Sequence, residues 1–173
     1  VNHTDIDGDT ITYTISGGAD SALFNIDSGT GVVTFKVAPN FEAPGDANTD
    51  DDYVIEVTAT DNGVGSLTAT QTITISVTDA NDAPSIISAS TASVAENQTS
   101  AIDVNHTDAD GNTITYTISG GVDAALFNID SGTGVVTFKV APNFEALGSN
   151  AGNNDYVINV TATDDGSGTL ADT

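Results

Sequence analysis

The sequence predicts an all-β chain of tandem Greek-key β-sandwiches in an end-to-end array. Runs rich in β-branched residues alternate apolar and polar side chains, as half-buried strands do. Turn-forming residues separate these runs at intervals of roughly 8–12 residues. A unit of 103 residues recurs along the 173-residue chain, which is about the size of one sandwich domain. No stretch has a convincing helical period.

Four strands are expected in the first copy, with turn residues between them. Tyrosine, isoleucine and valine alternate with threonine in these runs, which cover residues 11–15, 33–37, 53–60 and 72–77. Glycine and short polar residues form the breaks between them, at residues 17–18, 27–31 and 62–63. Most of the core bulk is expected from five aromatic side chains, namely Tyr13, Phe24, Phe35, Phe41 and Tyr53.

Comparison of the chain with itself defines the units. Residues 1–43 and 104–146 are identical at 39 of 43 positions without a gap, which indicates an array of domains. The segment 71–103 occurs only once, between the copies. We therefore expect a first repeat at 1–79 without its opening strands, and a linker at 80–84. A second repeat at 85–173 would lack its last strand. The absent strands belong either to a longer parent chain or to a neighbouring chain.

The stretch Asp79-Ala80-Asn81-Asp82-Ala83-Pro84 joins the two copies. Two carboxylates this close repel each other unless a cation lies between them, so the stretch is either a calcium-filled hinge or an ordinary polar linker. Pro84 cannot continue a strand ladder, which suits the start of a new unit. That unit is expected to open with residues 85–88, followed by Val94-Ala95-Glu96-Asn97 and a strand near 100–106.

Charge restricts the partners. The chain carries 25 acidic residues against two lysines, a net charge of −23. Nucleic acids and anionic membranes need a basic face and are therefore not expected as partners. Hard divalent cations fit better because they bind carboxylate and carbonyl oxygens. The alternative is that the acidity serves solubility in salty surroundings.

The sequence lacks the residues that several kinds of site and reaction need. Without cysteine there are no disulfides, thiolate zinc sites or cysteine catalysis. No nucleophile–base arrangement, phosphate loop or general acid pair stands out, so the chain is not expected to be an enzyme. No apolar run approaches the roughly 20 residues of a membrane span, and no signal peptide is visible.

Paired acids precede the first predicted strand of each copy, in Asp5-Ile6-Asp7-Gly8-Asp9 and Asp108-Ala109-Asp110-Gly111-Asn112. Acids at positions i and i+2 before a tight turn can both reach one ion, although a solvated turn is the alternative. The spacing is not that of an EF-hand, because the glycine is fourth rather than sixth and no bidentate glutamate follows.

Taken together, five short motifs resemble the calcium framework of cadherins. In the order of the family motifs x-E-N, D-R-E, linker, D-A-D and A-x-D, they are Val94-Ala95-Glu96-Asn97, Asn40-Phe41-Glu42 with its copy Asn143-Phe144-Glu145, Asp79-Ala80-Asn81-Asp82-Ala83-Pro84, Asp108-Ala109-Asp110, and Ala162-Thr163-Asp164 with its copy Ala59-Thr60-Asp61. The resemblance covers essentially the whole chain and implies cadherin-like, immunoglobulin-like sandwiches. The loop at 41–46 is similar to bacterial cadherin-like repeats of large secreted adhesins, including the extender arrays of RTX-type adhesins.

The resemblance implies one complete calcium junction, with two or three Ca²⁺ ions. Its ligands would be Asn40 and Glu42 from the first copy, Asp79, the Ala80 carbonyl, Asn81 and Asp82 from the linker, and Asp108, Asp110 and Asp164 from the second copy. Half-sites would face a preceding domain through Asp5, Asp7 and Asp61, and a following domain through Glu96, Asn143 and Glu145. Asn40 carries no charge, and the glutamate expected from the start of copy one is absent. At least one ion position is therefore expected to be weak.

A second acidic cluster follows Glu42. Asp46, Asp50, Asp51 and Asp52 form it, where the second copy has Ser149, Asn153, Asn154 and Asp155. The cluster is either an extra calcium site of copy one or a solvated loop. His3 and His106 are expected to be surface polar residues, since a zinc site would need a second histidine or a cysteine nearby.

The functional hypothesis is a calcium-rigidified extender, or spacer, of a large bacterial cell-surface or secreted adhesin. Its location would be extracellular, and its partners would be the neighbouring repeats of the same polypeptide. No nucleic acid or direct membrane contact is expected. The alternative is an adhesive module that binds another copy of itself or a polysaccharide, for which exposed aromatic side chains would be the signal.

Overall fold

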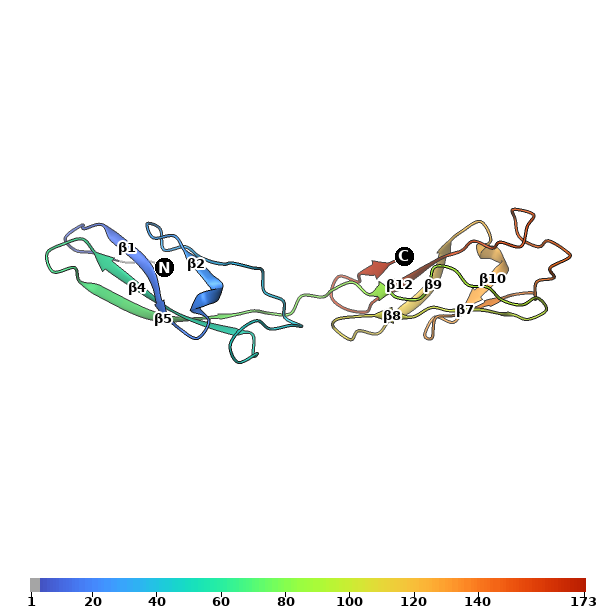
Figure 1. Cartoon of the computed structure of the whole chain (residues 1–173), viewed down its shortest axis with the longest axis horizontal. Coiled ribbons are helices and arrows are strands. Elements are labelled where there is room, and N and C mark those ends of the chain that lie inside the picture. The colour runs from blue at the N-terminus through green and yellow to red at the C-terminus, as the bar shows by residue number, and fades with distance from the viewer. Residues whose placement is uncertain (1–3) are drawn as a thin grey trace. The chain divides into compact units, whose positions relative to one another are not determined.

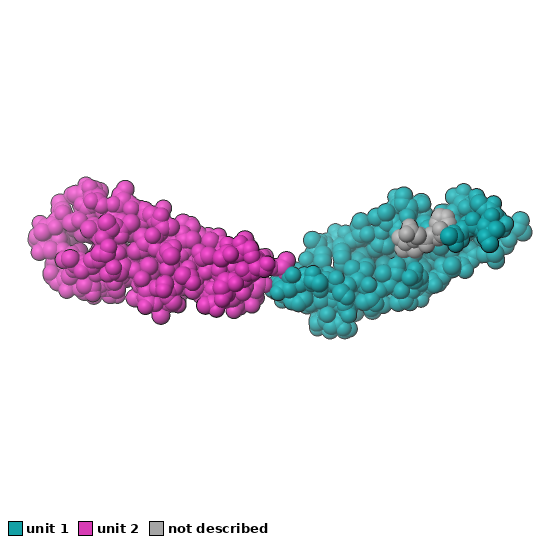
Figure 2. Space-filling view, turned by 180° about the vertical axis from the view of Figure 1, so that it is seen from behind, with its two compact units in different colours: residues 1–79 teal, residues 80–173 magenta. Residues whose placement is uncertain are grey.

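The computed structural model describes residues 4–173, so His3 lies outside the described part. The chain divides into two compact units, with the division after Asp79 (Figure 2). Each unit is built from antiparallel strands and one short 3-10 helix (Figure 1). Within the described residues, no helix is long and apolar enough to cross a membrane.

The first unit contains a three-stranded sheet and a hairpin. Its elements are β1 (Ile11–Gly17), the 3-10 helix η1 (Ser21–Leu23), β2 (Phe24–Ile26), β3 (Val33–Phe35), β4 (Asp52–Asp61) and β5 (Thr68–Ser76). The sheet has the order β1-β4-β5, and β2 pairs with β3. Tyr13 stands opposite Ala59, and Tyr53 opposite Ile75, which places the apolar residues of neighbouring strands on one face.

The second unit repeats this plan and adds strands. Its elements are β6 (Ser85–Ile86), β7 (Ser100–Asp103), β8 (His106–Thr107), β9 (Thr115–Gly120), the 3-10 helix η2 (Ala124–Leu126), β10 (Phe127–Ile129), β11 (Val135–Phe138), β12 (Asn159–Thr163) and β13 (Ala171–Asp172). One sheet has the order β13-β12-β9 and the other β10-β11-β7, while β6 pairs with β8. This is the all-β sandwich that the strand pattern predicts.

Aromatic rings occupy equivalent places in the two cores. The rings of Phe24 and Phe35 are 4.4 Å apart at 38°, and so are those of Phe127 and Phe138. The first core is centred on Tyr13, Phe24, Tyr53, Ile55 and Val57, and the second on Val104, Ile114, Tyr116, Phe127, Val136, Phe138 and Ala162. Burying each large apolar side chain contributes about 1.5–3 kcal/mol, so these clusters account for much of the driving force for folding.

One expected core position and the end of one expected strand are wrong. Phe41 is 38% exposed, and Val37, at the end of the strand expected at 33–37, is 80% exposed. Strand β3 ends at Phe35, and the chain then enters irregular loops in which period-two alternation no longer sets the inward face. Phe41 lies in a turn closed by the bond from the Ala43 N–H to the Asn40 carbonyl, outside any strand.

The single strand expected near 100–106 is divided in two. β7 joins β11, whereas β8 joins β6, and buried Val104 lies between them. The expectation that His106 is a surface residue is also wrong. It is half-buried, and its Nδ1 lies 2.5 Å from the hydroxyl oxygen of Tyr116.

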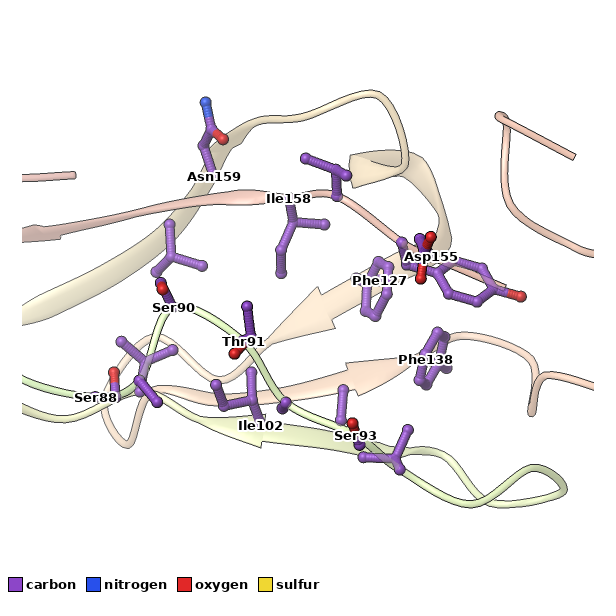
Figure 3. A pocket seen from close by; sticks show the side chains of 18 of the residues that line it. Ser88, Ser90, Thr91, Ser93, Ile102, Phe127, Phe138, Asp155, Ile158 and Asn159 are labelled. Atoms are coloured by element: carbon purple, nitrogen blue, oxygen red, sulfur yellow. The ribbon is translucent and has the colours of Figure 1, made fainter. Parts of the chain in front are cut away.

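A cleft of about 1150 Å³ opens in the second unit. Figure 3 shows Ile102, Phe127, Phe138 and Ile158 around it. In the first unit, the counterparts Phe24, Phe35 and Ile55 line a smaller cleft of about 470 Å³ together with Ile73 and Ile75 of β5. Both units therefore leave part of the apolar face of the sandwich open.

Candidate metal centres

The paired acids of the second unit lie in a turn that its own backbone shapes. Gly111 has φ +70°, a conformation that glycine adopts without strain. The Asn112 N–H donates to Asp108 Oδ1 at 2.8 Å, so one carboxylate oxygen closes the turn. The other oxygen, Asp108 Oδ2, is left to bind something else.

The linker is attached to this turn through two residues. The Asp82 N–H donates to Asp110 Oδ2 at 2.7 Å. Asn81 Nδ2 donates to Asp164 Oδ2 at 3.0 Å, and Asn81 Oδ1 accepts from Asn112 Nδ2 at 2.8 Å. These bonds hold the start of the linker against the acids of the second unit.

Asp164 is the most buried acid of the group, with 3% of its surface exposed. Its Oδ1 accepts the N–H groups of Gly166 and Leu170 at 3.1 and 3.0 Å. A Cβ built on Gly166 would stand 1.8 Å from Asn81 Oδ1, so only glycine leaves room for the linker amide here. The backbone thereby fixes Asp164 and Asn81 before any ion binds.

Two buried oxygens of this group lack a hydrogen-bond partner among the described residues. They are Asp108 Oδ2 and Asp110 Oδ1. Burying a carboxylate oxygen without a partner is costly, and a cation removes that cost. All nearby side-chain ligands are carboxylate or amide oxygens, which suits a hard cation such as Ca²⁺ and not zinc. The residues present therefore fit a calcium ion.

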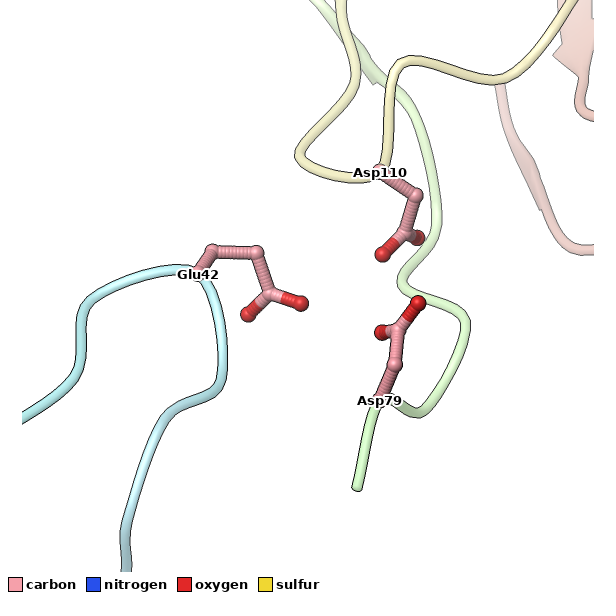
Figure 4. Close-up of side chains that lie close together, drawn as sticks. All are labelled: Glu42, Asp79 and Asp110. Carbon is pink, nitrogen blue, oxygen red and sulfur yellow. The ribbon is translucent and has the colours of Figure 1, made fainter. Parts of the chain in front are cut away.

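Glu42 and Asp79 of the first unit form an acid pair. Their carboxylates have oxygens within 4.8 Å of each other and face each other in Figure 4, which also draws Asp110 of the second unit. Both residues are exposed. Asn40 Oδ1 accepts from the Glu42 N–H at 2.8 Å, so this amide shapes the turn that carries Glu42.

The first unit repeats the acidic turn at its own start. Asp5 Oδ1 accepts from the Asp9 N–H at 3.0 Å, and Asp61 Oδ1 accepts from Gly63 and Leu67 at 3.1 and 3.0 Å. Asp7 is exposed. The backbone therefore holds Asp5 and Asp61 as it holds their counterparts in the second unit.

The expected half-site of the second unit involves three residues around one turn. Glu96 Oε2 accepts from the Phe144 N–H at 3.0 Å, and Asn143 Oδ1 accepts from the Glu145 N–H at 2.9 Å. Glu96 is thus brought to the turn that carries Glu145, although the two are 49 positions apart. Ala80 and Asp82 are exposed in the linker.

Sequence reasoning missed three residues that shape the centre and one buried acid elsewhere in the second unit. Asn112 and Gly166 hold Asn81, and Asp165 Oδ1 accepts the Thr113 N–H at 2.8 Å. Asp123 is fully buried and accepts the N–H groups of Asn150 and Val157 at 2.7 and 2.8 Å. An aspartate within an apolar stretch, such as Asp123 after Val122, was the available signal for a buried acceptor.

Comparison with known proteins supports one fold. No family model matches the chain. Among curated proteins, human Protocadherin Fat 1 is 32% identical over 165 residues (91% of this chain), and human Protocadherin Fat 4 is 34% identical over 143 residues (78% of this chain). The chain spans about 3% of the length of either relative.

A solved structure of a protocadherin resembles the chain in its fold. The crystal structure of human protocadherin-24 EC1-2 aligns with a TM-score of 0.60 at 19% identity, covering 98% of this chain and 80% of that chain. At this identity the likeness concerns the fold alone. Together with the all-β topology of both units, it shows that the chain has a cadherin-like β-sandwich fold.

Proposed function

We propose that this chain is a calcium-rigidified extender segment of a large bacterial cell-surface or secreted adhesin, and that it works outside the cell. The observation that carries the proposal is the pair of buried, unpartnered oxygens on Asp108 and Asp110. The net charge of −23 supports it because acidic side chains bind calcium. The near-identical tandem copies support it because repeated domains add length to a protein. The two curated relatives are by name protocadherins.

In this proposal, residues of the chain itself position the calcium ligands. Backbone N–H groups orient Asp108, Asp110 and Asp164, and Asn81 holds the linker against them. Calcium would supply the positive charge that neutralises these acids. Glu42 and Asp79 would complete the ligand set from the first unit and so couple the two domains.

One ion position is expected to bind weakly. Asn40 brings no charge, and its side-chain oxygen already accepts the Glu42 N–H. Ca²⁺ affinity depends on the number of charged ligands, so an ion that relies on Asn40 would be the first to leave as calcium falls.

The adhesive alternative, binding to a polysaccharide or to another copy, is less well supported. Sugar recognition uses exposed aromatic faces beside polar groups. Tyr13, Tyr53 and Tyr116 are 2–3% exposed, and the rings of Phe24 and Phe127 are buried as well. Each unit exposes one phenylalanine, Phe41 at 38% and Phe144 at 64%, and neither carries a polar group of its own. The buried tyrosine rings favour a spacer, and specific binding to a glycan array would reverse that ranking.

The test is small-angle X-ray scattering of the full chain in calcium and in EGTA. Calcium should narrow the distribution of maximum dimensions, because the ion removes the repulsion between the acids and fixes the joint. The midpoint of thermal unfolding should rise as well, by an amount equivalent to about 2.7 kcal/mol per site at a hundredfold excess over Kd.

A pair of matched variants makes this test specific. Asp108→Asn with Asp110→Asn should abolish the calcium response of the scattering curve. Asp5→Asn with Asp7→Asn, the same change in the first unit, should preserve it. A wild-type curve that is identical with and without calcium would contradict the extender function.

A further inference from the structure

The loop before β4 contains an acid whose burial the extender function does not explain. We name residues 46–51 the acidic loop. Asp46 is only 5% exposed. Its Oδ2 accepts from the Asp50 N–H at 3.1 Å, whereas its Oδ1 is buried without a hydrogen-bond partner. A carboxylate in this position needs a further partner for its charge.

Asp51 presents a second oxygen of the same kind. Its Oδ1 is also buried and lacks a hydrogen-bond partner. Burial, followed by the negative charges of Asp46, Asp50 and Asp52, raises the pKa of Asp51. Three neighbouring carboxylates therefore act on Asp51 through their negative charge.

The second unit provides an internal control, the Ser149 loop, defined as residues 149–154. Ser149 is 7% exposed, and its Oγ lies 2.8 Å from both the carbonyl oxygen and Oδ1 of Asn153. The Asn153 N–H donates back to Ser149 Oγ at 3.2 Å. No buried side-chain oxygen of this loop lacks a hydrogen bond, and the loop therefore closes with neutral groups.

The frames that carry the two loops are the same. Asp20 accepts the Ala47 N–H at 2.7 Å, and Asp123 accepts the Asn150 N–H at 2.7 Å. The backbone inside the loops differs, since Thr49 and Asp51 have φ of 59° and 63° where only Gly152 is left-handed in the copy. A β-branched residue such as Thr49 adopts this conformation only under constraint.

The unpartnered oxygens indicate what binds in the acidic loop. Across residues 4–173, four buried side-chain oxygens lack a hydrogen bond, two in the Asp108–Asp110 turn and two in the acidic loop. The acidic loop offers oxygen ligands only, with no histidine or cysteine, which excludes a typical zinc site. Several carboxylates on an irregular loop suit the variable coordination of Ca²⁺ better than the strict octahedron of Mg²⁺.

We propose that the acidic loop of the first unit is a calcium site in its own right, bound through Asp46 and Asp51 with Asp50 beside them. This site lies within one sandwich and is separate from the acids of the linker. It would brace the loop against β4, and the second copy would lack it because its Ser149 loop is closed by hydrogen bonds.

The first test replaces the acids of the acidic loop by the residues that the second copy has at the same positions. The full-length variant Asp46→Ser, Asp50→Asn and Asp51→Asn carries the side chains of the Ser149 loop, which are compatible with this frame. Native mass spectrometry and calcium titration calorimetry should find one ion fewer per chain than in the wild type. An unchanged number of bound ions would overturn the proposal.

The reciprocal variant tests for a gain of binding. Ser149→Asp, Asn153→Asp and Asn154→Asp should add one calcium ion per chain, and failure to gain an ion would count against the assignment of these three positions. The variant Asp108→Asn with Asp110→Asn separates this proposal from the extender function. It should lose ions of the linker region and keep the ion of the acidic loop.

Discussion

The two copies show which residues encode the fold and which vary the chemistry on it. Residues 1–43 and 104–146 share 39 of 43 positions, and their paired rings have the same separation and angle. The buried acceptors Asp20 and Asp123 hold equivalent loops with bonds of 2.7–2.8 Å. The loops themselves differ, one closed by carboxylates and the other by serine and asparagine. The same frame thus carries two different polar networks.

One difference between the copies, Asp9 in the first and Asn112 in the second, shows how a side chain can vary while the backbone of the turn stays the same. Asn112 donates from its amide to Asn81 Oδ1, a bond that Asp9, its counterpart in the first copy, could not make as a carboxylate. Both residues nevertheless donate their backbone N–H groups to the first aspartate of the turn. The turn is therefore conserved between the copies, while its contact with a linker residue depends on the side chain.

The largest loss of stability is expected at Asp20 and Asp123, the buried acceptors that make matching hydrogen bonds in the two copies. Asp123→Ala removes the acceptor of two part-buried N–H groups and should destabilise the second unit by about 3 kcal/mol, since each unsatisfied group costs about 1–3 kcal/mol. Asp20→Ala should affect the first unit to the same extent. Differential scanning calorimetry in excess calcium measures both.

The asparagine variants serve as controls for this experiment. Asp123→Asn and Asp20→Asn keep one acceptor oxygen and should retain part of the stability. Unequal losses from Asp123→Ala and Asp20→Ala would show that the two frames are not energetically equivalent, despite their matching distances.

An intermediate effect is expected at Gly166. Gly166→Ala would displace Asn81, because the new Cβ would lie 1.8 Å from its Oδ1, and would break its bonds to Asp164 and Asn112. Calcium affinity measured by calorimetry should fall about tenfold, or ~1.4 kcal/mol. Gly63→Ala is the matched change in the first copy, where the neighbour is Asp9 Oδ2 instead of a linker residue.

The result of this comparison depends on the linker. Asn81 makes its hydrogen bonds to Asp164 and Asn112 of the second copy, so Gly63→Ala should leave the ions of the linker region in place. If both variants weakened the same calcium binding, the role assigned to Asn81 would be wrong and a general effect on the turn would be the better explanation.

Much of the fold could be predicted from local pattern. Alternation of apolar and polar residues located β1, β4 and β5, because each of these strands has one face on the core. The same rule failed at Val37, since alternation has no meaning once a strand has ended. The general tendency of aromatic rings to be buried failed at Phe41. Alternation also failed to divide 100–106, because the change of sheet at Val104 depends on which strand lies alongside and not on the local sequence.

The candidate site was harder to predict. The order of short motifs pointed to Asp108, Asp110 and Asp164, and their ligand role remains a prediction. Sequence could not reveal that Asp46 is buried with an unpartnered oxygen, because burial of a loop acid depends on tertiary packing. It also could not identify Asn112 as the partner of Asn81, since the two are 31 positions apart and belong to different motifs.

The smallest effect is expected at a turn that both copies share. Asp27 Oδ1 accepts the Thr30 N–H at 2.7 Å, the Thr30 hydroxyl at 2.8 Å and the Gly29 N–H at 3.0 Å, and Asp130 makes the equivalent bonds. The Thr30 N–H, then its hydroxyl and then the Gly29 N–H lower the pKa of Asp27 below its usual value. Asp130 has a lowered pKa for the corresponding reasons.

A lowered pKa of a carboxyl group stabilises the fold above the unfolded-state pKa, about 3.9 for aspartate, and this contribution is lost as the pH falls through the folded-state value. Asp27→Asn and Asp130→Asn should therefore lower the unfolding midpoint slightly at pH 7. They should also flatten its dependence on pH below about pH 4. Thermal unfolding in calcium-free buffer between pH 3 and pH 7 measures this. Equal changes in the unfolding midpoint of both units would show that the turn contributes equally to the two copies. A change confined to one unit would mean that the neighbouring acids, which differ between the copies, influence the pKa of the turn aspartate.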